Sequence, residues 1–313
     1  MSTIEKAAAR LVSKPRVVAP PAPESLQGDS ATSSAEEASL AKESEAQSSE
    51  SADYQTSERL QTCELDFPWL AENGFLVPGH ENPKQASEFR RIKRPLLLNT
   101  QASIAQAQQL PTNTIFITSS LSGEGKTFVS LNLALSLAAE LDKSVLLIDG
   151  DAAKGDLSRW MGIDGQPGLV DLLVEGQGYG ESAIVDTNVD HLQVMPCGTP
   201  VDNLDELYAS SLMATLVSGL AGYDPNRIVI VDGPPLIATT EASVLARCFG
   251  QVVLIVEANE TPQSVVEQAA SQLADCQLVS MVLNKSTTAT GGSYGYGYGY
   301  GDERARYPAE QGA

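Results

Sequence analysis

The sequence predicts an α/β protein of three layers, in which helices cover both faces of a mostly parallel sheet of about seven strands. Short apolar runs rich in Val, Ile and Leu recur along the chain and alternate with segments of helical periodicity. Two of these runs end in Asp, where parallel sheets carry functional side chains. A glycine-rich turn joins the first run to a helical segment. These observations predict a ligand site at the carboxyl edge of the sheet.

The glycine-rich turn is the segment 119–127, SSLSGEGKT, between an apolar run at 114–118 and a helical run at 128–141. Such a turn leaves backbone N–H groups free at a helix N-terminus, where the dipole favours an anion, and glycines let the backbone close around phosphate. The pattern GxxxxGK[ST] is matched except at its first glycine, where Ser120 stands. We expect Lys126 to reach the β- and γ-phosphates of ATP and the Thr127 hydroxyl to bind Mg²⁺. The nucleotide-binding residues expected in this segment are Ser122, Gly123, Glu124, Gly125, Lys126, Thr127 and Phe128.

Two later strands end in carboxylates. Residues 144–148 are followed by Asp149 and Asp151, and residues 227–231 are followed by Asp232. Because parallel strands end at one edge, these side chains should meet the phosphates there. Asp149 and Asp232 are candidate Mg²⁺ ligands, and Asp149 or Asp151 is the candidate proton acceptor. One Asp alone would be an ordinary turn residue, whereas the pair favours chemistry. The expected catalytic residues are Lys126, Asp149, Asp151 and Asp232.

The other elements continue the alternation of strands and helices. Apolar residues at helical spacing predict one continuous amphipathic helix at 203–220. Asn284 closes the last strand, where a nucleotide base could lie, although Asn is also a common strand terminator. The remaining expected elements are a helix at 168–174, a strand at 191–196, a strand at 251–256, a helix at 263–273 and a strand at 278–283.

Composition narrows the possible functions. The chain of 313 residues has a formal net charge of −20, which argues against nonspecific nucleic-acid binding and against direct binding to anionic lipid. Its four Cys and two His lack metal-ligand spacing, so zinc chemistry is unsupported. We find no signal peptide and no apolar run of membrane-spanning length, and we therefore expect a cytoplasmic protein.

The apolar pattern predicts one globular domain between two tails. Residues 1–16 have helical spacing and local positive charge, which fits a short amphipathic helix or a frayed terminus. Residues 17–64, rich in Ala, Ser and Glu, should be disordered. Residues 65–87 concentrate aromatic and apolar side chains and should form an ordered lead-in to the domain at 88–286. Residues 287–313 alternate Tyr with Gly and should form a flexible tail, because glycine removes packing partners.

A charged element opens the domain. In EFRRIKR, at 88–94, Glu88, Arg91 and Arg94 recur every three positions and would lie along one face of a helix. Alternating charge on a helix is most often a solvated face, which is the simpler interpretation.

Taken together, these residues resemble the bacterial tyrosine kinases of exopolysaccharide export, and among them the exosortase-associated tyrosine autokinases, which lack a fused membrane segment. The resemblance extends from about residue 65 to the end of the chain and rests on SSLSGEGKT, LLIDGD, IVIVDGPP, EFRRIKR and the tyrosine cluster. It implies a phosphate-loop NTPase fold of the SIMIBI-like type. It also implies an ATP- and Mg²⁺-dependent autokinase whose phosphorylation regulates polysaccharide polymerisation and export. The implied phosphate acceptors are Tyr294, Tyr296, Tyr298, Tyr300 and Tyr307.

The resemblance also assigns roles and partners by matching positions. Lys126 is similar to the phosphate-binding lysine, Asp149 and Asp151 to the catalytic acidic pair, and Asp232 to the later acidic residue. The family's ExxRxxR element, which joins subunits into a ring, is matched by Glu88, Arg91 and Arg94. The implied partners are a membrane-anchored activator of the chain-length-determinant type and a cognate phosphotyrosine phosphatase. The kinase would be peripheral to the inner membrane through such a partner.

One departure keeps other functions open. The family has an Arg two residues after the second Asp, where this chain has Ala153 followed by Lys154. A lysine supplies a point charge but not the planar fork of arginine, which puts efficient transfer in doubt. One alternative is a switch ATPase of the deviant phosphate-loop class, which is disfavoured because Leu121 stands where those proteins carry a signature Lys. The other is a nucleotide-gated scaffold without catalysis, which Ala153 keeps open.

Overall fold

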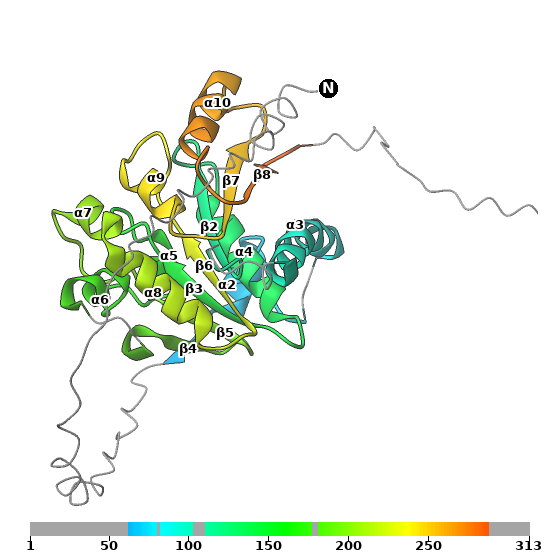
Figure 1. Cartoon of the computed structure of the whole chain (residues 1–313). Coiled ribbons are helices and arrows are strands. Elements are labelled where there is room, and N and C mark those ends of the chain that lie inside the picture. The colour runs from blue at the N-terminus through cyan, green and yellow to red at the C-terminus, as the bar shows by residue number, and fades with distance from the viewer. Residues whose placement is uncertain (1–61, 80–81, 103–109, 177–180, 288–313) are drawn as a thin grey trace, which may run out of the picture.

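The computed structural model describes residues 62–79, 82–102, 110–176 and 181–287. Over these residues it confirms the predicted three-layer α/β fold (Figure 1). The elements are β1 (Thr62–Cys63), α2 (Phe67–Glu72), α3 (Pro83–Ala102), β2 (Thr114–Ser119), α4 (Lys126–Ala138), β3 (Ser144–Asp149), α5 (Asp156–Trp160), α6 (Leu169–Glu175), the 3-10 turn η2 (Glu181–Ala183), β4 (Val185–Thr187), β5 (Leu192–Met195), α7 (Leu204–Ala209), α8 (Ser211–Gly222), β6 (Arg227–Asp232), α9 (Glu241–Ala246), β7 (Gln251–Glu257), α10 (Gln263–Gln272) and β8 (Val279–Asn284). The predicted helix at 1–16, the linker up to residue 61 and the tail from 288 lie outside the described residues.

The strand order places three functional segments together. The sheet runs β1-β4-β5-β3-β6-β2-β7-β8. Among the described residues, β4 and β5 form the only antiparallel pair. β6 lies between β3 and β2, and Asp149 is in register with Asp232. The two acidic strand ends therefore lie beside the turn that follows β2, at the carboxyl edge of the sheet.

The core lies on both sides of the central strands because alternate residues of a strand point to opposite faces. One set packs against α2, α3, α4 and α5, and the other packs against α6, α7, α8, α9 and α10. Figure 1 shows α3 and α4 on one side of the sheet and α8 on the other. The first set includes Ile115, Ile117, Val145, Leu147, Ile228 and Ile230, and the second includes Phe116, Leu146, Ile148, Val229 and Val231.

The sheet has more strands than predicted. There are eight strands where about seven were expected. The short ones, β1 and β4, have two and three residues, which is too few for a periodic pattern to show. β1 is part of the segment 17–64 that was expected to be disordered, so the strand structure begins at Thr62 and not after residue 64. β1 pairs with β4, which lies far along the sequence, so that Thr62 is in register with Asp186.

Two helices differ in extent from the prediction. α3 begins at Pro83 and continues through Pro95, whereas the sequence analysis placed only residues 88–94 on a helix. Pro95 removes one helix hydrogen bond, but it is exposed, so water can satisfy the freed carbonyl. The predicted helix at 203–220 is two helices, α7 and α8, because Ser210 adopts an extended backbone with ψ of 154°. None of the described helices has both the length and the apolar character needed to cross a bilayer.

Candidate functional site

The turn after β2 depends on two glycines. Gly123 and Gly125 both have φ of +91°, a conformation that side-chain-bearing residues rarely adopt. A Cβ on Gly125 would also lie only 2.3 Å from Asn284 Nδ2. Gly125 is the N-cap of α4 and supplies no side-chain hydrogen bond to it. The first N–H groups of α4 are thus not capped by this residue, which is the arrangement that binds phosphate at helix N-termini.

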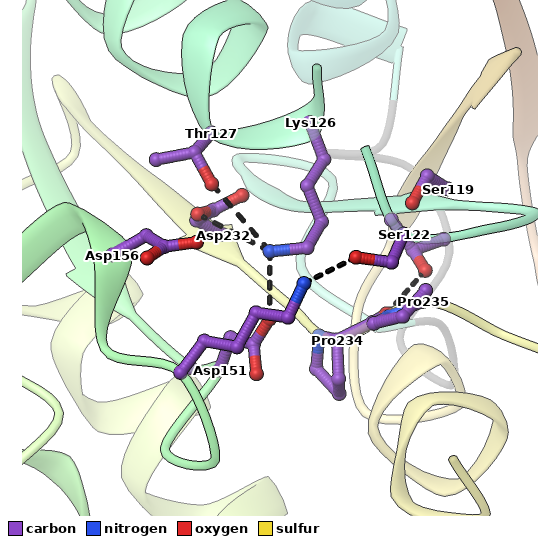
Figure 2. Close-up of polar contacts among 12 residues, drawn as sticks. Ser119, Ser122, Lys126, Thr127, Asp151, Asp156, Asp232, Pro234 and Pro235 are labelled. Atoms are coloured by element: carbon purple, nitrogen blue, oxygen red, sulfur yellow. Dashed lines mark hydrogen bonds and ion pairs between the residues drawn. The ribbon is translucent and has the colours of Figure 1, made fainter. Parts of the chain in front are cut away.

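Lys126 is the centre of a buried charge cluster. Its Nζ lies 2.7 Å from Asp151 Oδ2, 3.8 Å from Asp232 Oδ2 and 3.5 Å from Thr127 Oγ1. Figure 2 shows the lysine pointing among these three side chains. Burial alone would lower the pKa of Lys126, but the charges of Asp232 and Asp151 outweigh it and raise that pKa. Lys126 is therefore positively charged at neutral pH.

Asp232 is the acidic residue at the end of β6. Its Oδ1 accepts a hydrogen bond of 3.0 Å from Ser130 Oγ, on the first turns of α4. Burial raises the pKa of Asp232, and the charge of Lys126 opposes that shift. The Oδ2 atoms of Asp151 and Asp232 both face the ammonium group of Lys126, and a hydrogen bond from the Thr127 side chain also favours the charged form of Asp232. The ammonium group of Lys126 is what compensates these two oxygens.

Asp149 has a different environment from Asp151. Its Oδ2 accepts hydrogen bonds from Ser158 N, at 2.8 Å, and from Ser158 Oγ, at 2.7 Å. Its Oδ1 accepts one from Asp151 N, at 3.2 Å. Burial and the charge of Asp232 raise the pKa of Asp149 to about 6, although the bonds from Ser158 act against this. Asp149 thus ties the end of β3 to α5, while Asp151 contacts Lys126. Nothing in the sequence indicated the contact between Ser158 and Asp149, because the two residues are nine positions apart and lie in different elements.

Glu124, predicted to bind nucleotide, supports the turn from inside. Its side chain is buried, with 2% of the residue exposed. The carboxylate accepts hydrogen bonds from Leu121 N, at 2.7 Å, from Glu257 N, at 3.2 Å, and from the hydroxyl of Thr261. Glu124 therefore joins the turn to the end of β7 and to the segment before α10.

The end of β8 also holds the turn. Asn284 Nδ2 donates to Glu124 O, at 2.8 Å, so the amide contacts the phosphate-loop backbone. Lys285 Nζ donates to Gly123 O, at 2.8 Å, and pairs with Glu257 Oε2, at 2.9 Å. Lys285 has φ of +55°, which is unusual for a residue with a side chain. In the sequence, the only indication that Lys285 lies near the site was its position directly after Asn284.

The remaining predicted residues are spread over several places. The ring of Phe128 packs against Phe75, with centroids 4.9 Å apart, so this residue belongs to an aromatic cluster. Ser122 Oγ accepts a hydrogen bond from Lys154 Nζ. In the residues that the structure describes, no three Asp, Glu, His or Cys side chains converge to hold a metal ion by themselves. Glu88, Arg91 and Arg94 are exposed along α3, and the five tail tyrosines lie outside the described residues.

The chain is similar in sequence to known proteins. Residues 115–290 match the CobQ/CobB/MinD/ParA nucleotide binding domain. The chain is also 31% identical over 220 residues to the putative tyrosine-protein kinase CapB of Staphylococcus aureus, an alignment that covers 69% of this chain and 91% of CapB. The chain belongs to the bacterial tyrosine kinase family. Its identity to another relative, the tyrosine-protein kinase YwqD of Bacillus subtilis, is 32% over 184 residues, covering 58% of this chain and 76% of YwqD.

Solved kinase domains of this family have the same fold. The kinase domain of VpsO aligns with a TM-score of 0.53 and 30% identity, over 64% of this chain and 95% of that domain. The kinase domain of the Escherichia coli tyrosine kinase ETK aligns with a TM-score of 0.54 and 25% identity, over 68% of this chain and 80% of that one. Longer relatives are matched in part, since the tyrosine-protein kinase ptk of Acinetobacter johnsonii is covered over 23% of its length.

Proposed function

We propose that this bacterial tyrosine kinase transfers the γ-phosphate of ATP to tyrosines of its own C-terminal segment, and that this regulates exopolysaccharide polymerisation and export. The observation that carries the proposal is the position of Lys126 Nζ, 2.7 Å from Asp151 at a strand-to-helix turn built for phosphate. The tyrosine cluster at 294–307 supplies acceptors within the same chain.

The site residues divide the work of transfer. Lys126 and the N–H groups at the start of α4 bind the β- and γ-phosphates. A bound Mg²⁺ ion would neutralise phosphate charge. Mg²⁺ usually takes one or two ligands from the protein and its other ligands from phosphate and water. The hydroxyl of Thr127 and the carboxylate of Asp232 fit this need, because both supply oxygen ligands and both lie beside Lys126.

Asp151 is the proposed proton acceptor. Tyrosine has a pKa near 10, so the phenolic proton must pass to a nearby base as the phosphate is transferred. Both oxygens of Asp149 accept hydrogen bonds within the β3–α5 connection, and we assign it to holding that connection. The partner of Asp151 Oδ2 is the ammonium group of Lys126. Bound nucleotide phosphates would draw this ammonium group away from Asp151.

The tyrosine cluster begins nine positions after Lys285, a residue that contacts the phosphate loop. Lys285 contacts Gly123, and the described chain continues two residues further, to Thr287. An extended chain gains about 3.3–3.6 Å per residue, so tyrosines beyond this point can span tens of ångströms. We propose that they are phosphorylated by a neighbouring subunit. A transfer rate per molecule that rises with protein concentration would support this, and a constant rate would oppose it.

The wider setting is proposed from the family. A membrane-anchored activator of the chain-length-determinant type would recruit the kinase to the inner membrane from the cytoplasm, and a cognate phosphatase would reset the tyrosines. We place the chain with the exosortase-associated autokinases on the motifs named above. A switch ATPase remains the main rival, because the matching family of nucleotide binding domains also includes MinD and ParA proteins. The other rival is a scaffold that binds nucleotide without transfer.

The deciding experiment is intact-mass measurement of the full chain after incubation with ATP and Mg²⁺, with and without the cytoplasmic part of its activator. We expect additions of phosphate that disappear in Lys126→Met and in a variant with all five tail tyrosines changed to Phe. Asp151→Asn should still bind ATP but add no phosphate, because the amide oxygen can accept a hydrogen bond from Lys126 in place of the ion pair but cannot take the phenolic proton.

Other outcomes would favour a rival function. ATP hydrolysis without phosphate on the protein would identify a switch ATPase. Nucleotide binding without hydrolysis or transfer would identify a scaffold. Additions that persist in the five-tyrosine variant would place the acceptors elsewhere in the chain.

A further inference from the structure

The connection between β3 and α5 brings a lysine to the phosphate loop. Lys154 Nζ donates a hydrogen bond to Ser122 Oγ, although the two residues are 32 positions apart in sequence. The lysine is exposed, and none of the ion pairs among the described residues includes it. An ammonium group thus lies beside the turn without a carboxylate partner.

The backbone of this connection is held firmly. Asp151 O accepts hydrogen bonds from Lys154 N, at 3.0 Å, and from Gly155 N, at 2.7 Å. Gly155 has φ of +57°, which allows the tight reversal before α5. The guanidinium of Arg159 donates to Lys154 O. Further along, Ser158 is bonded to Asp149. The position of Lys154 at the turn is therefore built by the fold.

The other lysines near the turn already have carboxylate partners. Lys126 pairs with Asp151 and lies close to Asp232, and Lys285 pairs with Glu257. A triphosphate carries one more charged group than a diphosphate, and charge-assisted hydrogen bonds to phosphate are the strong ones. Lys154 is the cation of the described site that can bind this group without losing an ion pair.

We propose that Lys154 Nζ exchanges Ser122 for the oxygens of the γ-phosphate, so that it distinguishes ATP from ADP and assists transfer. This inference rests on the proposed kinase function. In the transfer step, the tyrosine oxygen forms a bond to the γ-phosphorus while the bond to the β,γ-bridging oxygen breaks. The phenolic proton passes to Asp151, and ADP leaves with the bonding electrons. Lys154 stays protonated throughout and neutralises charge on the transferred group.

This role would compensate for Ala153, which stands where the family has an arginine. The side chain of residue 153 is too short to reach a phosphate, and the next residue places its amino group at the phosphate loop. A lysine is a point charge that cannot bind two oxygens as a fork. Lys154→Arg should therefore preserve the preference for ATP and can improve on it, whereas Lys154→Ala should lose it.

The test is calorimetric titration of the full chain with a non-hydrolysable ATP analogue and with ADP, both with Mg²⁺. We expect Lys154→Ala to weaken binding of the analogue by about ten- to a hundredfold, the usual value of a charge-assisted hydrogen bond. Its ADP affinity should stay within about twofold of wild type, because the β-phosphate contacts remain. At saturating ATP, its rate of phosphate transfer should also fall, and Lys154→Arg should restore both properties.

A control variant tests whether the effect is specific to Lys154, and two outcomes separate the role of Lys154 from the kinase function. Lys143→Ala removes the same charge from the segment before β3, at the opposite edge of the sheet, and should leave both affinities unchanged. An unchanged ATP-to-ADP preference in Lys154→Ala, with binding abolished by Lys126→Met, would overturn the role of Lys154 but not nucleotide binding. An ATP preference that depends on Lys154, in a protein that transfers no phosphate, would uphold the role of Lys154 and overturn the kinase function.

Discussion

Asp149 and Asp151 are two positions apart in the sequence, yet their environments differ. Asp149 accepts hydrogen bonds from Ser158 and from the backbone of Asp151, and it is 1% exposed. Asp151 faces the ammonium group of Lys126. Burial and the charge of Asp232 raise the pKa of the Asp149 carboxyl. These contacts support the proposal that Asp149 holds the β3–α5 connection and that Asp151 accepts the proton.

The pKa of about 6 at Asp149 predicts how stability depends on pH. The folded protein holds this proton to higher pH than the unfolded chain does, so the unfolding free energy should fall as pH rises from about 4 to about 6. The contribution of this group is about 3 kcal/mol. Asp149→Asn should flatten the curve by that amount, as measured by urea unfolding across this range.

The exposed Asp164 provides the control for this experiment. Asp164→Asn should keep the slope of the wild-type protein. Asp232, whose pKa is also raised by burial, contributes the same sign of slope to all three proteins. Equal slopes in Asp149→Asn and wild type would show that Asp149 is already ionised at low pH in the folded protein.

At the scale of elements, the glycine-rich turn is supported by strands that are distant in sequence. β7 and β8 end beside it, and they contribute Glu257, Asn284 and Lys285 to its contacts. Glu124 joins the turn to these strands, because its carboxylate accepts hydrogen bonds from its own loop, from the end of β7 and from the segment just before α10. The backbone shape that phosphate requires is thus held by the sheet as well as by the glycines.

Glu124→Gln should weaken this support. An amide group would replace one acceptor oxygen with a donor, and a buried N–H or hydroxyl group would lose its partner at a cost of about 1–3 kcal/mol. We expect a lower melting temperature and a weaker affinity for ADP and ATP alike, measured by thermal unfolding with and without nucleotide. Glu260→Gln, exposed on the same connection, should change neither. Normal stability of Glu124→Gln would mean that the turn keeps its shape without the brace.

At the scale of the whole molecule, α3 presents a charged face to solvent. Glu88, Arg91 and Arg94 are exposed, whereas Phe89 and Leu96 on the opposite face are buried. This division leaves the charged face available to a second copy of the chain, in keeping with the ring that the family resemblance implies. Each phosphate on the tail would add about −1.5 to −2 charges at pH 7. Added to a chain of net charge −20, phosphorylation should oppose assembly by repulsion.

Changing Glu88, Arg91 and Arg94 together to Ala should reduce the native mass of the assembly to that of the monomer. Because these side chains are exposed, the unfolding free energy should change by no more than about 0.5 kcal/mol per residue. Native mass spectrometry measures the first effect and urea unfolding the second. Arg90→Ala, exposed on the same helix, is the control. An assembly of unchanged mass in the triple variant would place the subunit contact on another surface.

Much of the fold follows from patterns within single segments. The long central strands, the turn at SSLSGEGKT and the acidic strand ends were predicted because each depends on neighbouring residues. The short strands β1 and β4 were missed, since two or three residues show no period. The break at Ser210 was missed as well, because the apolar spacing continues across it. The predicted roles of the site residues remain proposals.

By itself, the sequence was enough to establish that phosphate-binding and acidic segments meet at one edge of a parallel sheet. It could not establish which partner each side chain takes there. Glu124 and Thr261 are separated by 137 positions, and Asn284 and Glu124 by 160. Local propensity carries no information about such contacts, because they arise only when the sheet brings strand ends together and burial forces each polar group to find a partner. That is why Asp149 holds a loop, Asp151 meets Lys126, and Lys154 reaches the phosphate loop.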